Sequence, residues 1–216
     1  MIKKLETMLK LQDEMNSTIN PEWRSAGNPW NEAIFVETGE LIEHHGFKWW
    51  KKEVPDMAQV RLEVVDIFHF LLSGAIEDLS KASLGITYKG IAKQLTVPLA
   101  NVEYDKITAG IKTTAMRLAN SVNELGYCQS FQYFWQLLFK VGMTFDELFD
   151  MYVGKNLLNI FRQQNGYKEG TYIKEWFGEE DNVYLAKVLE SVPDDVDYMP
   201  TYVLDKLTEQ YQKVCG

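Results

Sequence analysis

Residues 31–70, NEAIFVETGELIEHHGFKWWKKEVPDMAQVRLEVVDIFHF, contain two carboxylate pairs at helical spacing on either side of an aromatic and basic turn. Glu37 and Glu40 are three residues apart beside an apolar stripe, so both carboxylates border the predicted core. Glu63 and Asp66 repeat this spacing inside a segment that is apolar on nearly all sides. The stretch therefore predicts an amphipathic helix followed by a buried helix with a narrow polar seam.

The polar seam continues to His69, because Glu63, Asp66 and His69 drift by only about 60° around the helix axis. Carboxylates that face one another beside a core are costly unless a cation shares their charge. Arg61 is the only arginine in this stretch, so we favour divalent cations. An all-oxygen ligand set is typical of Mg²⁺. The alternative is a solvated first pair and a second pair that binds Lys or Arg from elsewhere.

The composition is that of one globular domain over residues 1–216, with 46% hydrophobic residues. A net charge of −9 argues against a broad surface for nucleic acid or anionic membranes. The two cysteines, Cys128 and Cys215, lack metal-ligand spacing and are typical of a reducing, cytoplasmic setting. No apolar run reaches about 18 residues, so no transmembrane helix is expected.

Helical periodicity dominates the chain, which predicts the all-α class. Residues 84–109 are looser, with Gly85 and Pro98, and predict a loop-rich insertion or short helices. Thr144 and Glu147 have the spacing of a capping box at the start of a later helix. The expected helices lie at about residues 2–19, 28–45, 55–76, 106–125, 130–141 and 144–164, with one or two more near the C-terminus.

Two further segments have the side chains of a nucleotide site. Gln12 and Asn16, one helical turn apart, could present amides to a planar ligand or be ordinary surface amides. The turn FKWWKKE, residues 47–53, could stack a base and meet phosphates, or cap the core with solvated lysines.

A third segment, near the C-terminal end, is basic. Lys155, Asn159 and Arg162 share one helix face, and the loop after them carries Tyr167 and Lys174. These residues could close over phosphates or form a solvated basic face. The P-loop, Rossmann, serine-hydrolase and zincin motifs are absent from the sequence.

Taken together, these blocks resemble the dimeric all-α dUTP diphosphatase (dUTPase) family, related to phage-type dCTP/dUTP pyrophosphatases and MazG-like nucleotide pyrophosphatases. The resemblance implies a MazG-like helical bundle with a carboxylate metal site, assembled as a homodimer. The blocks are LQDEMN (11–16), ETGEL (37–41), KWWKK (48–52), EVVDIFHF (63–70) and YVGKNLLNIFRQQNGY (152–167).

The resemblance also implies roles for individual residues. Glu37, as the first glutamate, orients or deprotonates the attacking water. Amides at Gln12 and Asn16 read the uracil edge, and His69 lies near the sugar. The implied Mg²⁺ ligands are Glu37, Glu40, Glu63 and Asp66. Trp49 or Trp50 packs near the base, and Lys51 of the same turn is a further substrate-binding residue. The implied phosphate contacts, some across a dimer interface, are Lys155, Asn159, Arg162, Tyr167 and Lys174.

The expected function is Mg²⁺-dependent hydrolysis of dUTP to dUMP and pyrophosphate, with dUDP as a further substrate. Because an amide can flip to suit uracil or cytosine, dCTP or another deoxynucleoside triphosphate is an alternative substrate. A second alternative is a non-catalytic helical dimer that binds a protein partner.

Overall fold

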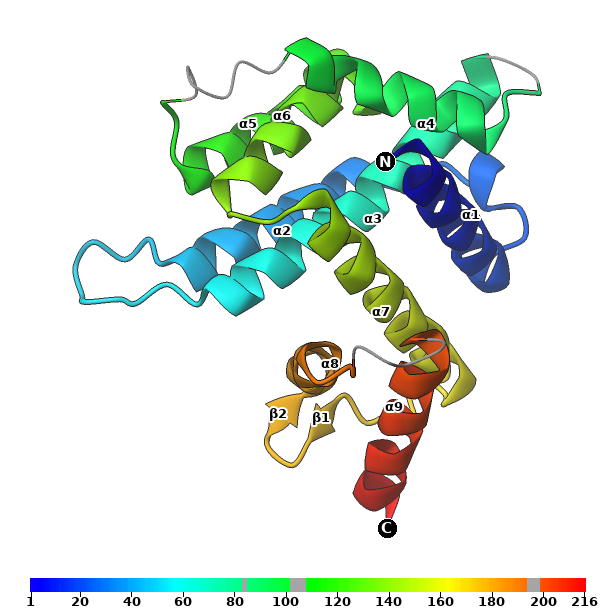
Figure 1. Ribbon diagram of the computed structural model, residues 1–216, viewed down its shortest axis with the longest axis vertical. Coiled ribbons are helices and arrows are strands. Elements are labelled where there is room, and N and C mark those ends of the chain that lie inside the picture. The colour runs from blue at the N-terminus through cyan, green and yellow to red at the C-terminus, as the bar shows by residue number, and fades with distance from the viewer. Residues whose placement is uncertain (83–84, 102–107, 194–198) are drawn as a thin grey trace. The chain divides into compact units, whose positions relative to one another are not determined.

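The computed structural model describes residues 1–82, 85–101, 108–193 and 199–216. The chain forms two compact units, Met1–Leu148 and Phe149–Gly216, and the expectation of one domain over 1–216 stays a prediction. Both units are built mainly of helices, which confirms the all-α class (Figure 1). No helix in the described part of the chain has the length and apolar composition needed to cross a bilayer.

Unit 1 is organised around helices α2 (Trp30–His45) and α3 (Met57–Ala82), which lie side by side (Figure 1). Helix α2 ends at His45 and is followed by Gly46, whose φ of 83° suits glycine better than a residue with a side chain. Asp56 precedes α3 and accepts a hydrogen bond from the Gln59 backbone N–H at 3.1 Å, as a helix cap does. Both helices were predicted, although α3 continues to Ala82 instead of ending near Ile76.

The other helices of unit 1 cover this pair. Helix α1 (Ile2–Ile19) packs on α3 and on α4 (Tyr88–Thr96), while α5 (Ile111–Leu125) packs on α2 and α6 (Tyr127–Lys140) packs on α3. The α5–α6 pair lies together along one side of α2 and α3 (Figure 1). This arrangement buries α3 on nearly all sides, as its apolar composition predicts.

An aromatic cluster joins α3 to α6. The rings of Phe68 and Phe134 stack with centroids 4.6 Å apart, and Phe131 and Trp135 pack around them. The Trp135 indole N–H donates to the Leu95 carbonyl at 3.0 Å, which satisfies its buried polar atom. The aromatic-rich sequence of α6 therefore forms core.

The segment 84–109, expected to be rich in loops, contains α4 and the short helix η2 (Val97–Asn101). The Thr87 hydroxyl caps α4 by accepting from the Gly90 N–H. The part of this expectation that concerns residue 84 and residues 102–107 lies outside the described residues. A further short helix, η1 (Trp23–Ser25), follows α1.

Helix α7 (Phe145–Gln164) begins in unit 1 and supplies the first helix of unit 2. The predicted capping box is confirmed: the Glu147 backbone N–H donates to the Thr144 hydroxyl at 3.2 Å, and the Thr144 backbone N–H donates to the Glu147 carboxylate at 2.6 Å.

Unit 2 adds a small hairpin and two helices to α7. Strands β1 (Glu175–Trp176) and β2 (Glu179–Glu180) pair antiparallel, and α8 (Asp181–Glu190) follows directly and packs on α9 (Met199–Cys215). An apolar core holds these elements together. Its buried members are Leu158, Phe161, Trp176, Leu185, Val188, Val203, Leu207 and Tyr211.

Candidate functional site

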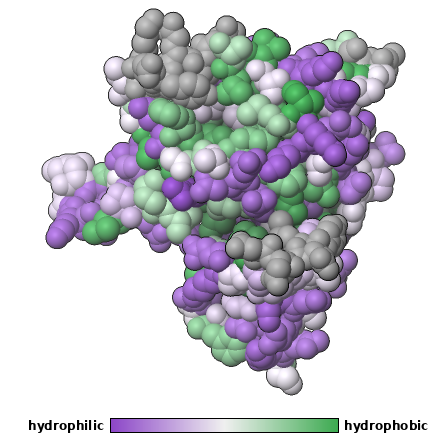
Figure 2. All heavy atoms as spheres, viewed as in Figure 1, coloured by the Kyte–Doolittle hydropathy of each residue, from purple (hydrophilic) through white to green (hydrophobic). Residues whose placement is uncertain are grey.

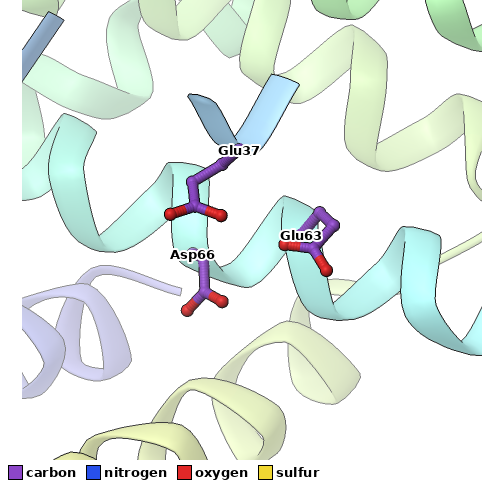
Figure 3. Close-up of side chains that lie close together, drawn as sticks. All are labelled: Glu37, Glu63 and Asp66. Carbon is purple, nitrogen blue, oxygen red and sulfur yellow. The ribbon is translucent and has the colours of Figure 1, made fainter. Parts of the chain in front are cut away.

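Three carboxylates from α2 and α3 meet in unit 1, and we call them the carboxylate cluster: Glu37, Glu63 and Asp66. One ligand oxygen of each lies within 4.8 Å of one from each of the other two. Figure 3 shows Glu37 reaching from α2 toward the side of α3 from which Asp66 and Glu63 project. Glu63 is buried, with 6% of its surface exposed, while Glu37 and Asp66 are half-buried. The contact between α2 and α3 therefore places like charges together at the edge of the core.

The donor set of the carboxylate cluster fits a divalent cation. Its ligands are carboxylate oxygens, which hard cations such as Mg²⁺ prefer. Arg61 serves another purpose, because its guanidinium donates to the carbonyls of Val141 and Gly142 at the end of α6. His44 is close, with its Nε2 3.6 Å from a Glu63 oxygen. A cation among the three carboxylates would relieve their mutual repulsion.

Glu40 lies one turn beyond Glu37 on α2 but is exposed, and it is not a member of the cluster. The structure thus brings together three of the four carboxylates expected to bind metal. Glu40 as a ligand stays a prediction.

Four buried polar side chains of α1 and α3 form a closed chain of hydrogen bonds that we call the amide ring: Gln12, Asn16, Ser73 and His69. Gln12 Nε2 donates to Asn16 Oδ1 at 3.1 Å, and Asn16 Nδ2 donates to Ser73 Oγ at 2.9 Å. The Ser73 hydroxyl donates to the His69 carbonyl at 3.0 Å, and His69 Nδ1 lies 2.7 Å from Gln12 Oε1. Each of the four is at most 6% exposed. The predicted base-reading residues are therefore held in one network, one helical turn from Asp66.

The loop between α2 and α3 presents the aromatic turn to solvent. Trp49 and Trp50 are 89% and 60% exposed, and their rings make an edge contact at 5.8 Å. Lys51 is exposed, with its ammonium 3.6 Å from a Glu53 oxygen, and Glu53 also accepts from the Lys48 backbone N–H. The loop projects from unit 1, and pale and purple residues cover its tip (Figures 1 and 2). The alternative in which these tryptophans cap the core is wrong.

In unit 2, the predicted phosphate-binding residues of α7 join a network around a buried acid. Asp181, at the start of α8, is 0% exposed and receives two hydrogen bonds from Arg162, at 2.8 and 2.7 Å. Arg162 also donates to Asn159 and Asn182, and Lys155 donates to the Asn182 side chain at 2.8 Å. The alternative of a solvated basic face is wrong for Lys155 and Arg162, which are 3% and 8% exposed. We call this group, together with Tyr172, the Asp181 network.

The Asp181 carboxylate raises the pKa values of its two neighbours, Arg162 and Tyr172. Burial alone lowers the pKa of the Arg162 guanidinium, but the paired Asp181 carboxylate more than offsets this, so that the pKa is raised. Burial and a 2.8 Å hydrogen bond to Asp181 both raise the pKa of the Tyr172 hydroxyl. Arg162 thus remains charged, and Tyr172 remains a neutral donor, across the physiological range.

Tyr167 and Lys174 lie at the periphery of this network. The Arg162 guanidinium is 5.8 Å from the Tyr167 ring centroid, a cation–π distance, and Tyr167 is 46% exposed. Lys174 is exposed and forms an ion pair with Glu180 at 3.1 Å.

Three residues that hold the predicted site residues in place were not predicted from the sequence: Ser73, Asp181 and Asn182. Ser73 falls four residues after His69 and so continues the polar seam, which is a signal that the spacing could have given. Asp181 and Asn182 begin a helix that was predicted, but the sequence gives no sign that they face Arg162.

A family model described as dUTPase matches residues 4–167. No curated protein matches the chain.

Proposed function

Since this chain belongs to the dUTPase family, and therefore hydrolyses dUTP to dUMP and pyrophosphate, we propose that the reaction takes place at the carboxylate cluster with Mg²⁺ as the divalent cation. The observation that carries the proposal is the approach of three carboxylate oxygens to within 4.8 Å of one another. The resemblance of ETGEL and EVVDIFHF to the family's metal motifs supports the same residues.

Bound Mg²⁺ would neutralise phosphate charge, polarise the electrophilic phosphorus and lower the pKa of a bound water. Glu37 acts as the base that orients and deprotonates the attacking water, because its carboxylate is half-buried but not enclosed. Glu63 and Asp66 project from the buried helix α3, so their positions are fixed before substrate binds. Glu40 is proposed as a ligand from the exposed side of α2.

A further proposal, which rests on the family resemblance, is that cations of the Asp181 network contact phosphate groups of the substrate, some across a dimer interface. Arg162 makes four hydrogen bonds within unit 2, to Asp181 twice and to Asn159 and Asn182, which leaves one of its five N–H groups. Arg162 therefore serves phosphate mainly as a fixed positive charge. Lys155, Tyr167 and Lys174 are the other proposed contacts, and Asn159 holds the guanidinium.

The base is proposed to meet the amide ring, with Gln12 and Asn16 at its edge and His69 near the sugar. Trp49, Trp50 and Lys51 are proposed to cover the nucleotide, since the exposed loop carries both stacking and cationic groups. Hydrolysis of dUDP is a further proposal that rests on the family resemblance. A cytoplasmic location is proposed from the two cysteines, which lack metal-ligand spacing.

A homodimer is proposed as well. Phe35 and Val36 on α2 are 42% and 57% exposed, and such apolar side chains on a helix surface are suited to an interface between copies of the chain. This exposure supports the assembly that the resemblance implies.

Pyrophosphate release from dUTP, dCTP, dTTP and UTP, together with orthophosphate release from dUDP, tests the proposed function directly. Wild-type protein is expected to hydrolyse dUTP selectively with Mg²⁺ and to stop when Mg²⁺ is chelated. Glu37→Ala is expected to abolish turnover, while the matched control Glu32→Ala, at an exposed position on the same helix, keeps it. Turnover that survives chelation, or that survives in folded Glu37→Ala, would contradict the proposed metal site.

A further inference from the structure

The amide ring contains one side chain that the proposed function does not use. Ser73 is 0% exposed on α3, receives the Asn16 amide at 2.9 Å and donates its own hydrogen to the His69 carbonyl at 3.0 Å. Ser73 thus lies between the Asn16 amide, which can be turned by about 180°, and the His69 backbone carbonyl, which cannot. Its hydrogen bonds can therefore determine which way the Asn16 amide is turned.

The hydroxyl of Ser73 determines which group donates and which accepts in each hydrogen bond of the amide ring. A hydroxyl has one hydrogen, and because that hydrogen points at the His69 carbonyl, Ser73 Oγ must accept from Asn16. Asn16 then turns its NH₂ toward Ser73 and its oxygen toward Gln12, so Gln12 must donate with its own NH₂. The Gln12 oxygen consequently faces His69 Nδ1, which must carry the hydrogen.

The opposite sense would require Ser73 to donate to Asn16, and the bond from its hydroxyl to the His69 carbonyl would be lost. One net hydrogen bond therefore separates the two orientations of Asn16 and Gln12. Uracil offers N3–H and O4 where cytosine offers N3 and an amino group, so a reversal of the amides exchanges the base that they match.

We propose that Ser73 is a specificity-determining residue, which sets the orientation of the Asn16 and Gln12 amides and thereby selects uracil over cytosine. The proposal rests on the proposed role of the amide ring in base recognition. Ser73 acts through Asn16 and does not itself touch the substrate.

The test compares kcat/KM for dUTP and for dCTP in wild type, Ser73→Ala and Ser73→Thr. Ser73→Ala removes one oxygen and should lower the dUTP/dCTP ratio by about tenfold, the value of one hydrogen bond. Ser73→Thr keeps the hydroxyl and should keep the ratio. Ser121→Ala is the matched control, because Ser121 is also buried and also donates to a carbonyl of its own helix, at Leu118.

The outcomes separate the inference from the function on which it rests. An unchanged ratio in folded Ser73→Ala, with kcat/KM for both nucleotides lowered equally, would show a merely structural role and overturn the inference. Equal use of dUTP and dCTP by wild type would overturn it too. A wild-type protein that hydrolyses neither nucleotide would instead overturn the proposed function.

Discussion

The carboxylate cluster of unit 1 and the Asp181 network of unit 2 are both charged and partly buried, but their charges are arranged in opposite ways. Glu37, Glu63 and Asp66 bring three like charges within 4.8 Å. Arg162 and Asp181 bring opposite charges together in a two-bond pair that is almost fully buried.

This difference separates a site whose like charges favour a divalent cation from one whose opposite charges pair with each other. Like charges raise one another's energy, and a divalent cation lowers it. A buried opposite pair already offsets the desolvation of both groups, and removal of either partner leaves a buried charge behind. We therefore expect the first region to govern catalysis and the second to govern stability as well as the position of its cations.

Among the substitutions that compare the two regions, the largest effect is expected from Asp66→Asn, which keeps the shape of the side chain but removes one charge from the cluster. We expect kcat for dUTP to fall about a thousandfold, or about 4 kcal/mol in barrier height. The free energy of unfolding measured in urea with a chelator should change by less than about 1 kcal/mol. A loss of stability as large as the loss of activity would contradict the expectation that the carboxylate cluster governs catalysis more than folding.

Asp181→Asn, in contrast to Asp66→Asn, should lower the stability of the fold substantially. The substitution leaves the Arg162 charge without its carboxylate inside unit 2, so the free energy of unfolding in urea should fall by about 3 kcal/mol or more. Glu180→Gln is the matched control, because Glu180 is the adjacent carboxylate and is exposed. Equal urea midpoints for the two variants would contradict a stabilising role for the buried pair.

The all-α class was predictable because periodicity reports which face of a helix is buried. The capping box at Thr144 was equally readable, since its two residues are close in sequence. The division into two units was not, because it depends on contacts between distant residues.

The candidate site likewise contains residues that local spacing predicts and others whose surroundings depend on distant contacts. Glu63, Asp66 and His69 follow from spacing on one helix, and Glu37 from its place beside the core. The exposure of Glu40 and the pairing of Arg162 with Asp181 depend on how whole helices pack, which local spacing does not determine.

The smallest effect is expected at an exposed helix cap, and it provides a reference value for the effects of Asp66→Asn and Asp181→Asn. Thr144→Ala removes the hydroxyl of the capping box of α7, although the backbone N–H still donates to Glu147, and should lower the free energy of unfolding by about 1 kcal/mol. A loss as large as that of Asp181→Asn would show that urea unfolding does not distinguish exposed from buried contacts here.

The same cap has a pH dependence with a definite sign. Hydrogen bonds from the Thr144 backbone and hydroxyl lower the pKa of Glu147. The stabilisation is therefore complete above the pKa of an unfolded glutamate and is lost as pH falls through the lower folded pKa. The difference in unfolding free energy between wild type and Thr144→Ala should shrink over that acidic range, and a difference that grows there would contradict the assignment.

The most direct test of the central claim is a titration of nucleotide-free protein with Mn²⁺, followed by electron paramagnetic resonance and by competition with Mg²⁺. The account predicts that Mn²⁺ binds wild type and Asp181→Asn alike, that Mg²⁺ displaces it, and that Asp66→Asn weakens binding by at least about tenfold. Binding to Asp66→Asn as tight as to wild type would show that the carboxylate cluster is not the metal site.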